Sequence, residues 1–290
     1  MRVEFLVVAV LLAVLYVVFI YAAEALLPCD ASQPQQQQQP QTTRSRRDEP
    51  AVIRQRMRGA CVATAVSLGL AACVLWLRAN EQQIGKEMGL APRAAPASAL
   101  VGVVLTCVGF LGPLAVDRLE GAFQWDSVRA AWSAWGMTEW RNLVVGPVTE
   151  ELVFRGSVVP LWLKAGVSPA GVIAFSPLVF AAAHVHHAVA ALMAVPRPPV
   201  NAVLARMVLQ ISYTWVFGCF AAALFIRTHS VAGSIAAHIV CNHQGLPDLR
   251  RISAGFPQYK YPLWIAHVVG LVGLAVLFEP MTRPGVFISE

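Results

Sequence analysis

Charged residues are scarce in this chain of 290 residues, where they make up 13% of the total against 57% for hydrophobic residues. The mean hydropathy of +0.59 is far above what a single soluble core of this length needs. So small a share of charge argues against a soluble globular protein. The composition indicates a polytopic membrane protein.

Several familiar signatures of catalysis and metal binding are also missing. The six cysteines are scattered and form no CxxC pair, so neither a disulfide framework nor a cysteine zinc site is indicated. The chain has no GxSxG elbow and no HExxH motif, and this removes the usual signals of a serine hydrolase and of a helical zinc protease. We find no internal repeat.

Long apolar runs predict the membrane-crossing elements. About 18 apolar residues are enough for a helix to cross the roughly 30 Å hydrocarbon layer, whereas barrel strands would alternate with period two. Together with three shorter runs that contain polar residues, the pattern predicts an all-α, polytopic transmembrane bundle of about eight helices. The clear runs are 5–23, 60–77, 100–116, 204–226 and 263–278, and the shorter ones are 143–163, 170–195 and 231–240.

A basic segment sets the expected topology. Residues 44–58 hold six arginines against two acids, directly before the second apolar run. The positive-inside rule places such a loop in the cytosol and the N-terminus on the opposite side. Beside a bilayer this reading is favoured over binding to nucleic acid, for which we expect no role. The preceding glutamine and proline tract cannot form a packed core and is expected to be a linker.

Two adjacent glutamates lie in the stretch GPVTEELVFRG, residues 146–156. An ionisable side chain at bilayer depth costs at least about 2.5–3.5 kcal/mol, so it normally faces a polar cavity and has a function there. On a helix, Glu151 and Arg155 share a face and are expected to form an ion pair. Glu150 points about 100° away and would be left as a usable general base. This division assumes an unbroken helix from Pro147 onward, so which glutamate is the base stays open, as does a purely structural role for both.

Two further polar islands follow. The stretch SPLVFAAAHVHHAV places three histidines within four positions, and His184 and His187 share a helical face. In AAHIVCNHQGLP, His238 and Asn242 are four residues apart and are stacked on one face of a helix that should end near Gly245. An imidazole beside an amide can donate two hydrogen bonds to the oxyanion of an acyl-transfer reaction.

The three islands together supply Glu150, His184, His238 and Asn242. One glutamate and one histidine can activate a water molecule, and the other histidine and the asparagine can stabilise a tetrahedral oxyanion. Because no serine or cysteine nucleophile accompanies them, the set indicates direct attack by water on an amide.

These motifs resemble those of a known family. GPVTEELVFRG is similar to the EExxxR motif, FAAAH to the FxxxH motif and HIVCN to the HxxxN motif of the type II, Rce1-like CAAX prenyl endopeptidases, which belong to the glutamate intramembrane proteases. The resemblance runs from about residue 142 to residue 248. Each motif alone is weak, but three in the same order are a strong signal.

The resemblance implies an eight-helix endopeptidase of the endoplasmic reticulum membrane with a site open to the cytosol. Its substrates would be farnesylated or geranylgeranylated CaaX proteins, which lose their last three residues, and no cofactor is implied. Glu150 and His184 would activate water, His238 and Asn242 would stabilise the oxyanion, and Glu151 and Arg155 would support the site.

The implied organisation divides the chain into five parts. They are an N-terminal transmembrane helix (1–27), a Gln/Pro-rich and basic cytosolic loop (28–58), transmembrane helices (59–120), a catalytic core (121–250) and a C-terminal transmembrane helix with its tail (251–290).

Three other readings remain at this point. Glu150, His184 and His238 could form a zinc site of the His2Glu type. A non-catalytic scaffold of the same superfamily would keep the fold without the reaction. A transporter could use the same residues as a proton relay, although the chain lacks the repeats typical of one.

Overall fold

The computed structural model describes residues 2–26, 48–79, 83–182, 185–193 and 198–287, and over these residues it is helical, without a strand. This confirms the predicted all-α class. The glutamine and proline tract and His184 lie outside the described residues. The principal helices are α1 (Val3–Leu26), α2 (Pro50–Ala79), α4 (Ala95–Gly109), α5 (Leu111–Leu119), α6 (Trp125–Ser133), α8 (Gly146–Val153), α9 (Val159–Lys164), α10 (Pro169–Ala182), α11 (Val185–Leu192), α12 (Val200–Thr228), α13 (Val231–Gln244) and α14 (Lys260–Met281).

Shorter elements connect them. These are α3 (Ile84–Glu87), α7 (Met137–Glu139), the π-helical segments η2 (Trp140–Val145), η3 (Phe154–Val158) and η4 (Arg251–Gly255), and the 3₁₀ turns η5 (Pro257–Tyr259) and η6 (Pro284–Val286).

Four described helices are long and apolar enough to cross a membrane: Val3–Ala25, Pro50–Ala79, Val200–Thr228 and Pro257–Met281. A fifth crossing arises if α4 and α5, which meet at a bend of 72°, are taken as one broken span. These five correspond to the five clear apolar runs of the sequence. Because α2 begins at Pro50, the last part of the segment predicted as a basic loop is helical.

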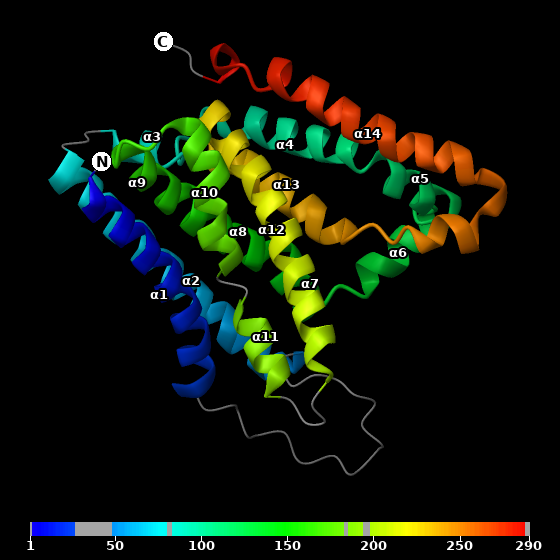
Figure 1. Cartoon of the computed structure of the whole chain (residues 1–290), viewed down its shortest axis with the longest axis horizontal. Coiled ribbons are helices and arrows are strands. Elements are labelled where there is room, and N and C mark those ends of the chain that lie inside the picture. Colours follow the sequence, from blue (N-terminus) through cyan, green and yellow to red (C-terminus); the bar gives the residue numbers. More distant parts are fainter. Residues whose placement is uncertain (1, 27–47, 80–82, 183–184, 194–197, 288–290) are drawn as a thin grey trace.

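The arrangement of the helices brings distant parts of the chain together (Figure 1). Helices α1 and α2 pack along each other at one side, and α10 packs along α12. Helix α13 packs along α4, which also contacts α14. The helical path 140–164 contacts α2 and α13, so it lies between the N-terminal pair and the C-terminal helices.

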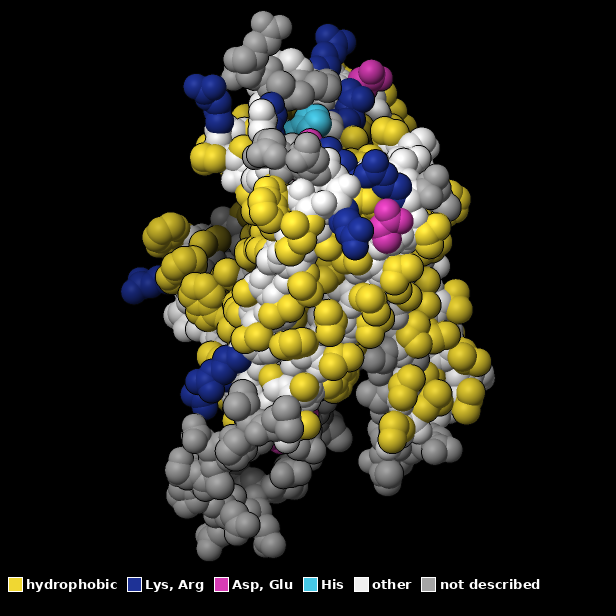
Figure 2. Space-filling view, turned by 90° about the vertical axis from the view of Figure 1, so that its left-hand side faces the viewer, with side chains coloured by type: hydrophobic (Ala, Val, Ile, Leu, Met, Phe, Trp, Pro, Cys, Tyr) yellow, Lys and Arg dark blue, Asp and Glu magenta, His cyan; other side chains and the backbone are white. Residues whose placement is uncertain are grey.

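The surface agrees with a protein embedded in a bilayer. Figure 2 shows hydrophobic side chains over most of the middle of one face, with most of the visible charged side chains toward its upper part and its edges. The exposed side chains include Val7, Leu11 and Val14 on α1 and Val268, Leu271 and Val272 on α14. Apolar side chains exposed on such helices meet lipid rather than water.

Glycine allows α13 to lie against α4. A Cβ on Gly102 would lie 2.2 Å from the carbonyl oxygen of Gly233, which no real side chain tolerates. Small residues at helix interfaces in membranes let two backbones approach closely. Helix α13 is capped at its N-terminus by Ser230, whose hydroxyl accepts a hydrogen bond from the backbone N–H of Ala232, and it ends before Gly245 at φ +67°. The helix therefore ends where the sequence predicted, near Gly245.

The path that carries the two glutamates is helical throughout, but it is not one regular α-helix. Residues 146–153 are α-helical and are flanked by the π-helical segments η2 and η3. Pro147 lies at the junction of η2 and α8 and has no N–H to donate to the preceding turn. Widened π turns are frequent at functional sites. Glu150 and Glu151 therefore do lie on a regular helix, whereas Arg155 lies in the π-helical turn that follows.

The glycine contact between α4 and α13 makes a direct prediction. Gly102→Ala should destabilise the protein by roughly 1–3 kcal/mol, because the new methyl group meets backbone atoms that cannot move aside. Gly69→Ala is the matched control, since nothing lies within 4 Å of its Cβ position on α2. Thermal unfolding in detergent should give a lower Tm for the first variant only. Equal Tm values for both variants would contradict the close approach of the two helices.

Candidate active site

A cavity of about 840 Å³ opens inside the helix bundle. Its wall is formed by side chains from α1, α2, α4, α8, α10, α12, α13 and α14. Most of the lining is apolar, including Phe110, Phe220, Leu271 and Leu274. The polar lining includes Glu150 from α8, and His238 and Asn242 from α13.

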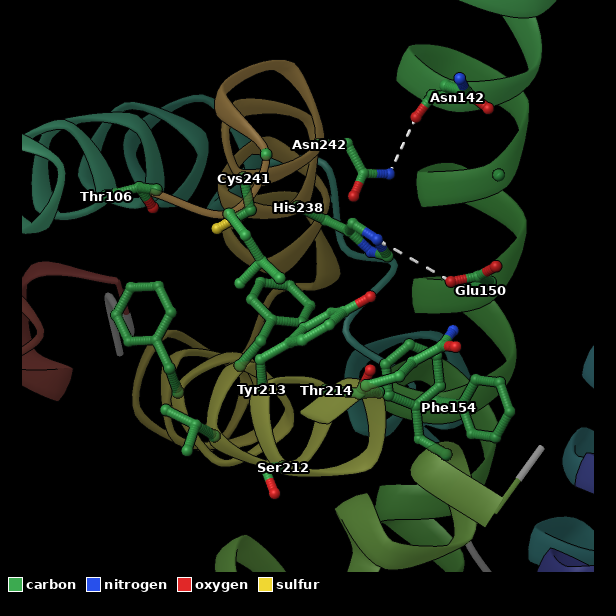
Figure 3. A pocket seen from close by; sticks show the side chains of 18 of the residues that line it. Thr106, Asn142, Glu150, Phe154, Ser212, Tyr213, Thr214, His238, Cys241 and Asn242 are labelled. Atoms are coloured by element: carbon green, nitrogen blue, oxygen red, sulfur yellow. Dashed lines mark hydrogen bonds and ion pairs between the residues drawn. The ribbon is translucent and has the colours of Figure 1, made fainter. Parts of the chain in front are cut away.

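Glu150 and His238 face each other in this cavity (Figure 3). The Oε2 atom of Glu150 lies 3.8 Å from Nε2 of His238, and their side chains are 25% and 8% exposed. Both residues line the cavity, so a small molecule in it can reach both. A carboxylate and an imidazole at this separation can share the protons of one reacting water.

Asn242 lies one turn beyond His238 on α13, as its spacing predicted. Its Nδ2 atom donates a hydrogen bond of 2.9 Å to the backbone carbonyl oxygen of Asn142, which lies on η2 (Figure 3). This bond fixes the amide beside the imidazole and ties the end of α13 to the start of the glutamate-bearing path. Asn142 also lines the cavity.

Glu151 is completely buried, and its carboxylate contacts the side chains of both Arg155 and His238. Its Oε1 atom accepts a hydrogen bond of 3.0 Å from a terminal nitrogen of Arg155, and it lies 2.8 Å from Nδ1 of His238. The predicted ion pair with Arg155 is therefore confirmed. The contact with His238 was not predicted, and it orients the imidazole so that Nε2 is directed toward Glu150 and the cavity.

Aromatic rings enclose this charged group. The guanidinium of Arg155 lies over the rings of Phe180, at 4.8 Å, and Phe217, at 5.7 Å. The ring of Phe217 is also 4.8 Å from that of His238. Arg155 additionally donates to the backbone carbonyl oxygen of Gly218 on α12. A guanidinium on aromatic faces keeps its charge at little cost away from water.

A second contact holds the α8 backbone from the N-terminal side. The hydroxyl groups of Tyr16 on α1 and Thr149 on α8 lie 2.8 Å apart in a buried hydrogen bond. Thr149 directly precedes Glu150, and Tyr16 itself lines the cavity. The first helix of the chain is thus part of the site.

The structure brings together most of the residues that the sequence singled out. Glu150, His238 and Asn242 line one cavity, while Glu151 and Arg155 are buried behind its wall. His184 lies outside the described residues. The described part of the chain contains no group of three His, Cys, Asp or Glu side chains placed to hold a metal ion. The alternative zinc set includes His184.

The cavity residues that the sequence analysis did not single out include Tyr16, Arg56 and Arg141. Tyr16 lies in an apolar run where a single hydroxyl gives no pattern. Arg56 was read only as one of many positive charges at a membrane boundary. Arg141 and Asn142, a polar pair directly before the helix with the glutamates, were a signal that could have been used.

Comparison with known proteins gives a consistent result. The sequence model of the type II CAAX prenyl endopeptidase Rce1-like family matches residues 132–243. A human protein named CAAX prenyl protease 2 is 32% identical over 258 residues, which are 83% of this chain and 75% of the relative. This chain belongs to that family. No solved structure matches it.

Other family members differ in how much of their length is covered. The CAAX prenyl protease 2 of Caenorhabditis elegans is 30% identical over 82% of this chain and 88% of its own length. That of Arabidopsis thaliana is 38% identical, but the match covers 58% of this chain and only 52% of the relative. This chain therefore spans about half of the Arabidopsis member.

The two glutamates should differ in their effect on stability. Glu151→Gln removes the charge shared by Arg155 and His238, and breaking a buried pair in this way costs roughly 3–5 kcal/mol. Glu150→Gln changes a partly exposed side chain of the cavity wall and should leave Tm nearly unchanged. Thermal unfolding of both variants in the same detergent measures the difference. Equal Tm values would show that the carboxylate of Glu151 does not stabilise the fold in this way.

Proposed function

We propose that this protein is an intramembrane endopeptidase that removes the C-terminal tripeptide from farnesylated or geranylgeranylated CaaX proteins. The observation that carries the proposal is the pairing of Glu150 with His238 in a cavity of the helix bundle, in a member of the CAAX prenyl endopeptidase family. The relatives with the name CAAX prenyl protease 2 support the same substrate class.

Glu150 and His184 are the proposed activators of the attacking water. Glu150 takes a proton from the water, and the hydroxide forms a bond to the carbonyl carbon of the scissile amide. The C–N bond then breaks, and the proton passes to the leaving amine of the tripeptide. Glu150 suits this role because it reaches the cavity without an Arg partner among the described residues.

His238 and Asn242 are the proposed stabilisers of the oxyanion. When its imidazole carries both protons, His238 donates from Nδ1 to Glu151 and has Nε2–H left for the cavity. The amide of Asn242 lies on the same face of α13, so both donors can approach one oxygen. Glu151 and Arg155 are supporting residues in this scheme, since they hold His238 and do not reach the substrate.

The cavity also suits the two unlike halves of such a substrate. A prenyl chain is hydrocarbon and requires apolar walls, which Phe110, Phe220, Leu271 and Leu274 supply. The peptide requires polar partners, which lie on the wall of α8 and α13. A cavity inside a bilayer-embedded bundle can accept both parts at once.

The proposed location is the endoplasmic reticulum membrane, with access from the cytosol. The arginines at the start of α2 mark the expected cytosolic end of that helix. Arg141, at the start of the glutamate-bearing path, forms an ion pair of 3.1 Å with Asp48 at the same end. These contacts support access to the site from the cytosol, the side on which prenylated proteins are expected to arrive.

A peptidase assay on the purified protein in liposomes tests the proposal. A fluorogenic farnesylated CaaX peptide should be cleaved, and its unprenylated twin should not, with or without a chelator. Glu150→Gln should lower kcat by at least about 100-fold, because the general base is lost while the fold is kept.

Other outcomes of this assay would favour one of the alternative functions. Cleavage that a chelator abolishes would place Glu150, His184 and His238 in a zinc site. A folded protein that cleaves neither peptide would be a non-catalytic scaffold. Full activity in Glu150→Gln would remove Glu150 from the role of base.

A further inference from the structure

Two arginines line the cavity that holds Glu150. Arg56 comes from α2, and Arg141 comes from η2, which packs against α2. Their side chains are 17% and 18% exposed, so each guanidinium is largely enclosed by protein. Glu150 is the third charged side chain in the described lining.

Each arginine is held by an acid that is not itself part of the described lining. Arg56 donates to Oε2 of Glu24 at 2.7 Å, and Arg141 lies 3.1 Å from Oδ1 of Asp48. Arg141 also donates from Nε to the side chain of Asn142. These contacts fix the two guanidinium groups at the wall. A guanidinium has five N–H donors, so a bond to one acid does not exhaust its capacity.

The position of Arg141 relative to Glu150 indicates which group of a substrate the two arginines can bind. The two residues are nine positions apart on one continuous helical path, which corresponds to at most about 13 Å along the axis. A tripeptide in extended form covers about 10 Å. Both residues line the same cavity, so a peptide that runs from Glu150 toward η2 brings its C-terminus, three residues beyond the scissile amide, toward the long side chain of Arg141.

We propose that Arg141 and Arg56 form the binding site for the free α-carboxylate of the substrate. This inference rests on the proposed function, and it explains how cleavage is set three residues from the chain end. The helix separates the base from the carboxylate site by a fixed length. A carboxylate in a cavity within the bilayer needs such a partner, since an unpaired charge there is costly.

The chemistry of the site favours a carboxylate over other groups. Arginine forms charge-assisted and often bidentate hydrogen bonds to carboxylates, and a largely enclosed site strengthens them. A C-terminal amide has the same length but no negative charge. The structure thus predicts discrimination by charge at the chain end, separate from recognition of the lipid.

The test compares two farnesylated CaaX peptides that differ only in ending in a carboxylate or a carboxamide. The protein in liposomes should cleave the carboxylate form with a kcat/KM at least about tenfold higher. Arg141→Gln should bring this ratio toward one, mainly by raising KM for the carboxylate peptide. Arg56→Gln should act in the same direction, and Arg141→Lys should keep part of the preference because it keeps the charge.

Matched controls separate substrate binding from a structural role of the ion pairs. Asp48→Asn and Glu24→Gln break the same two pairs but leave both arginines in place, so they should keep the preference for the carboxylate. If these variants lose the preference as fully as Arg141→Gln does, the arginines act only by holding the helices together.

The outcomes also distinguish this inference from the proposed function. Equal cleavage of both peptides by the unchanged protein, or an unchanged ratio in Arg141→Gln and Arg56→Gln, would overturn the carboxylate site and leave the protease in place. Cleavage of neither peptide by a folded protein would overturn both.

Discussion

A carboxylate that water cannot reach must be stabilised by its neighbours. Glu151 is the residue of the site to which this constraint applies most strongly. It is fully buried, and one of its oxygens meets both Arg155 and His238. Removing such a group from water costs several kcal/mol, which only close partners can offset. The arrangement joins α8, which carries Glu151, to three other helical elements, because Arg155 lies in η3, His238 in α13 and the carbonyl oxygen bound by Arg155 in α12. The same contacts that stabilise the charge therefore position the imidazole.

The rest of the bundle can be understood from the need to bring α13 to this carboxylate. Gly102 and Gly233 allow α4 and α13 to touch through their backbones, and Ser234 donates to a carbonyl oxygen of α12. Gly218 leaves room for Pro177, so that α10 and α12 lie close together beside Arg155. Small residues are needed at these contacts because the hydrophobic effect does not drive helices together in lipid. Close packing must supply the attraction instead.

Much of this could be predicted from the sequence. The apolar runs follow directly from the thickness of the bilayer, and the pairing of Glu151 with Arg155 follows from their spacing on a helix. The common face of His238 and Asn242 and the end of α13 at Gly245 also follow from local rules. Each of these depends on residues within a turn or two of each other.

The contacts that complete the site could not be predicted in this way. His238 and Glu151 are far apart in the chain, as are Tyr16 and Thr149, and no periodicity relates them. At the bend between α4 and α5, both helices contact α14, which is far away in the sequence. For the same reason Arg56 was read as a topological signal, although the fold places it at the cavity.

The cavity extends well beyond the segment that the family model matches. Residues 132–243 supply Glu150, His238 and Asn242, whereas Tyr16, Arg56, Phe110 and the apolar side chains of α14 come from outside it. Groups that carry out a reaction must keep fixed positions, but walls that fit a lipid or a chain end can vary in sequence while they keep their polarity. Under the proposed function, the matched segment supplies the catalytic groups and Arg141, and the helices around it supply Arg56 and further apolar wall. The hydrogen bond between Tyr16 and Thr149 is one link between these two parts, since it connects the first helix to the residue next to Glu150.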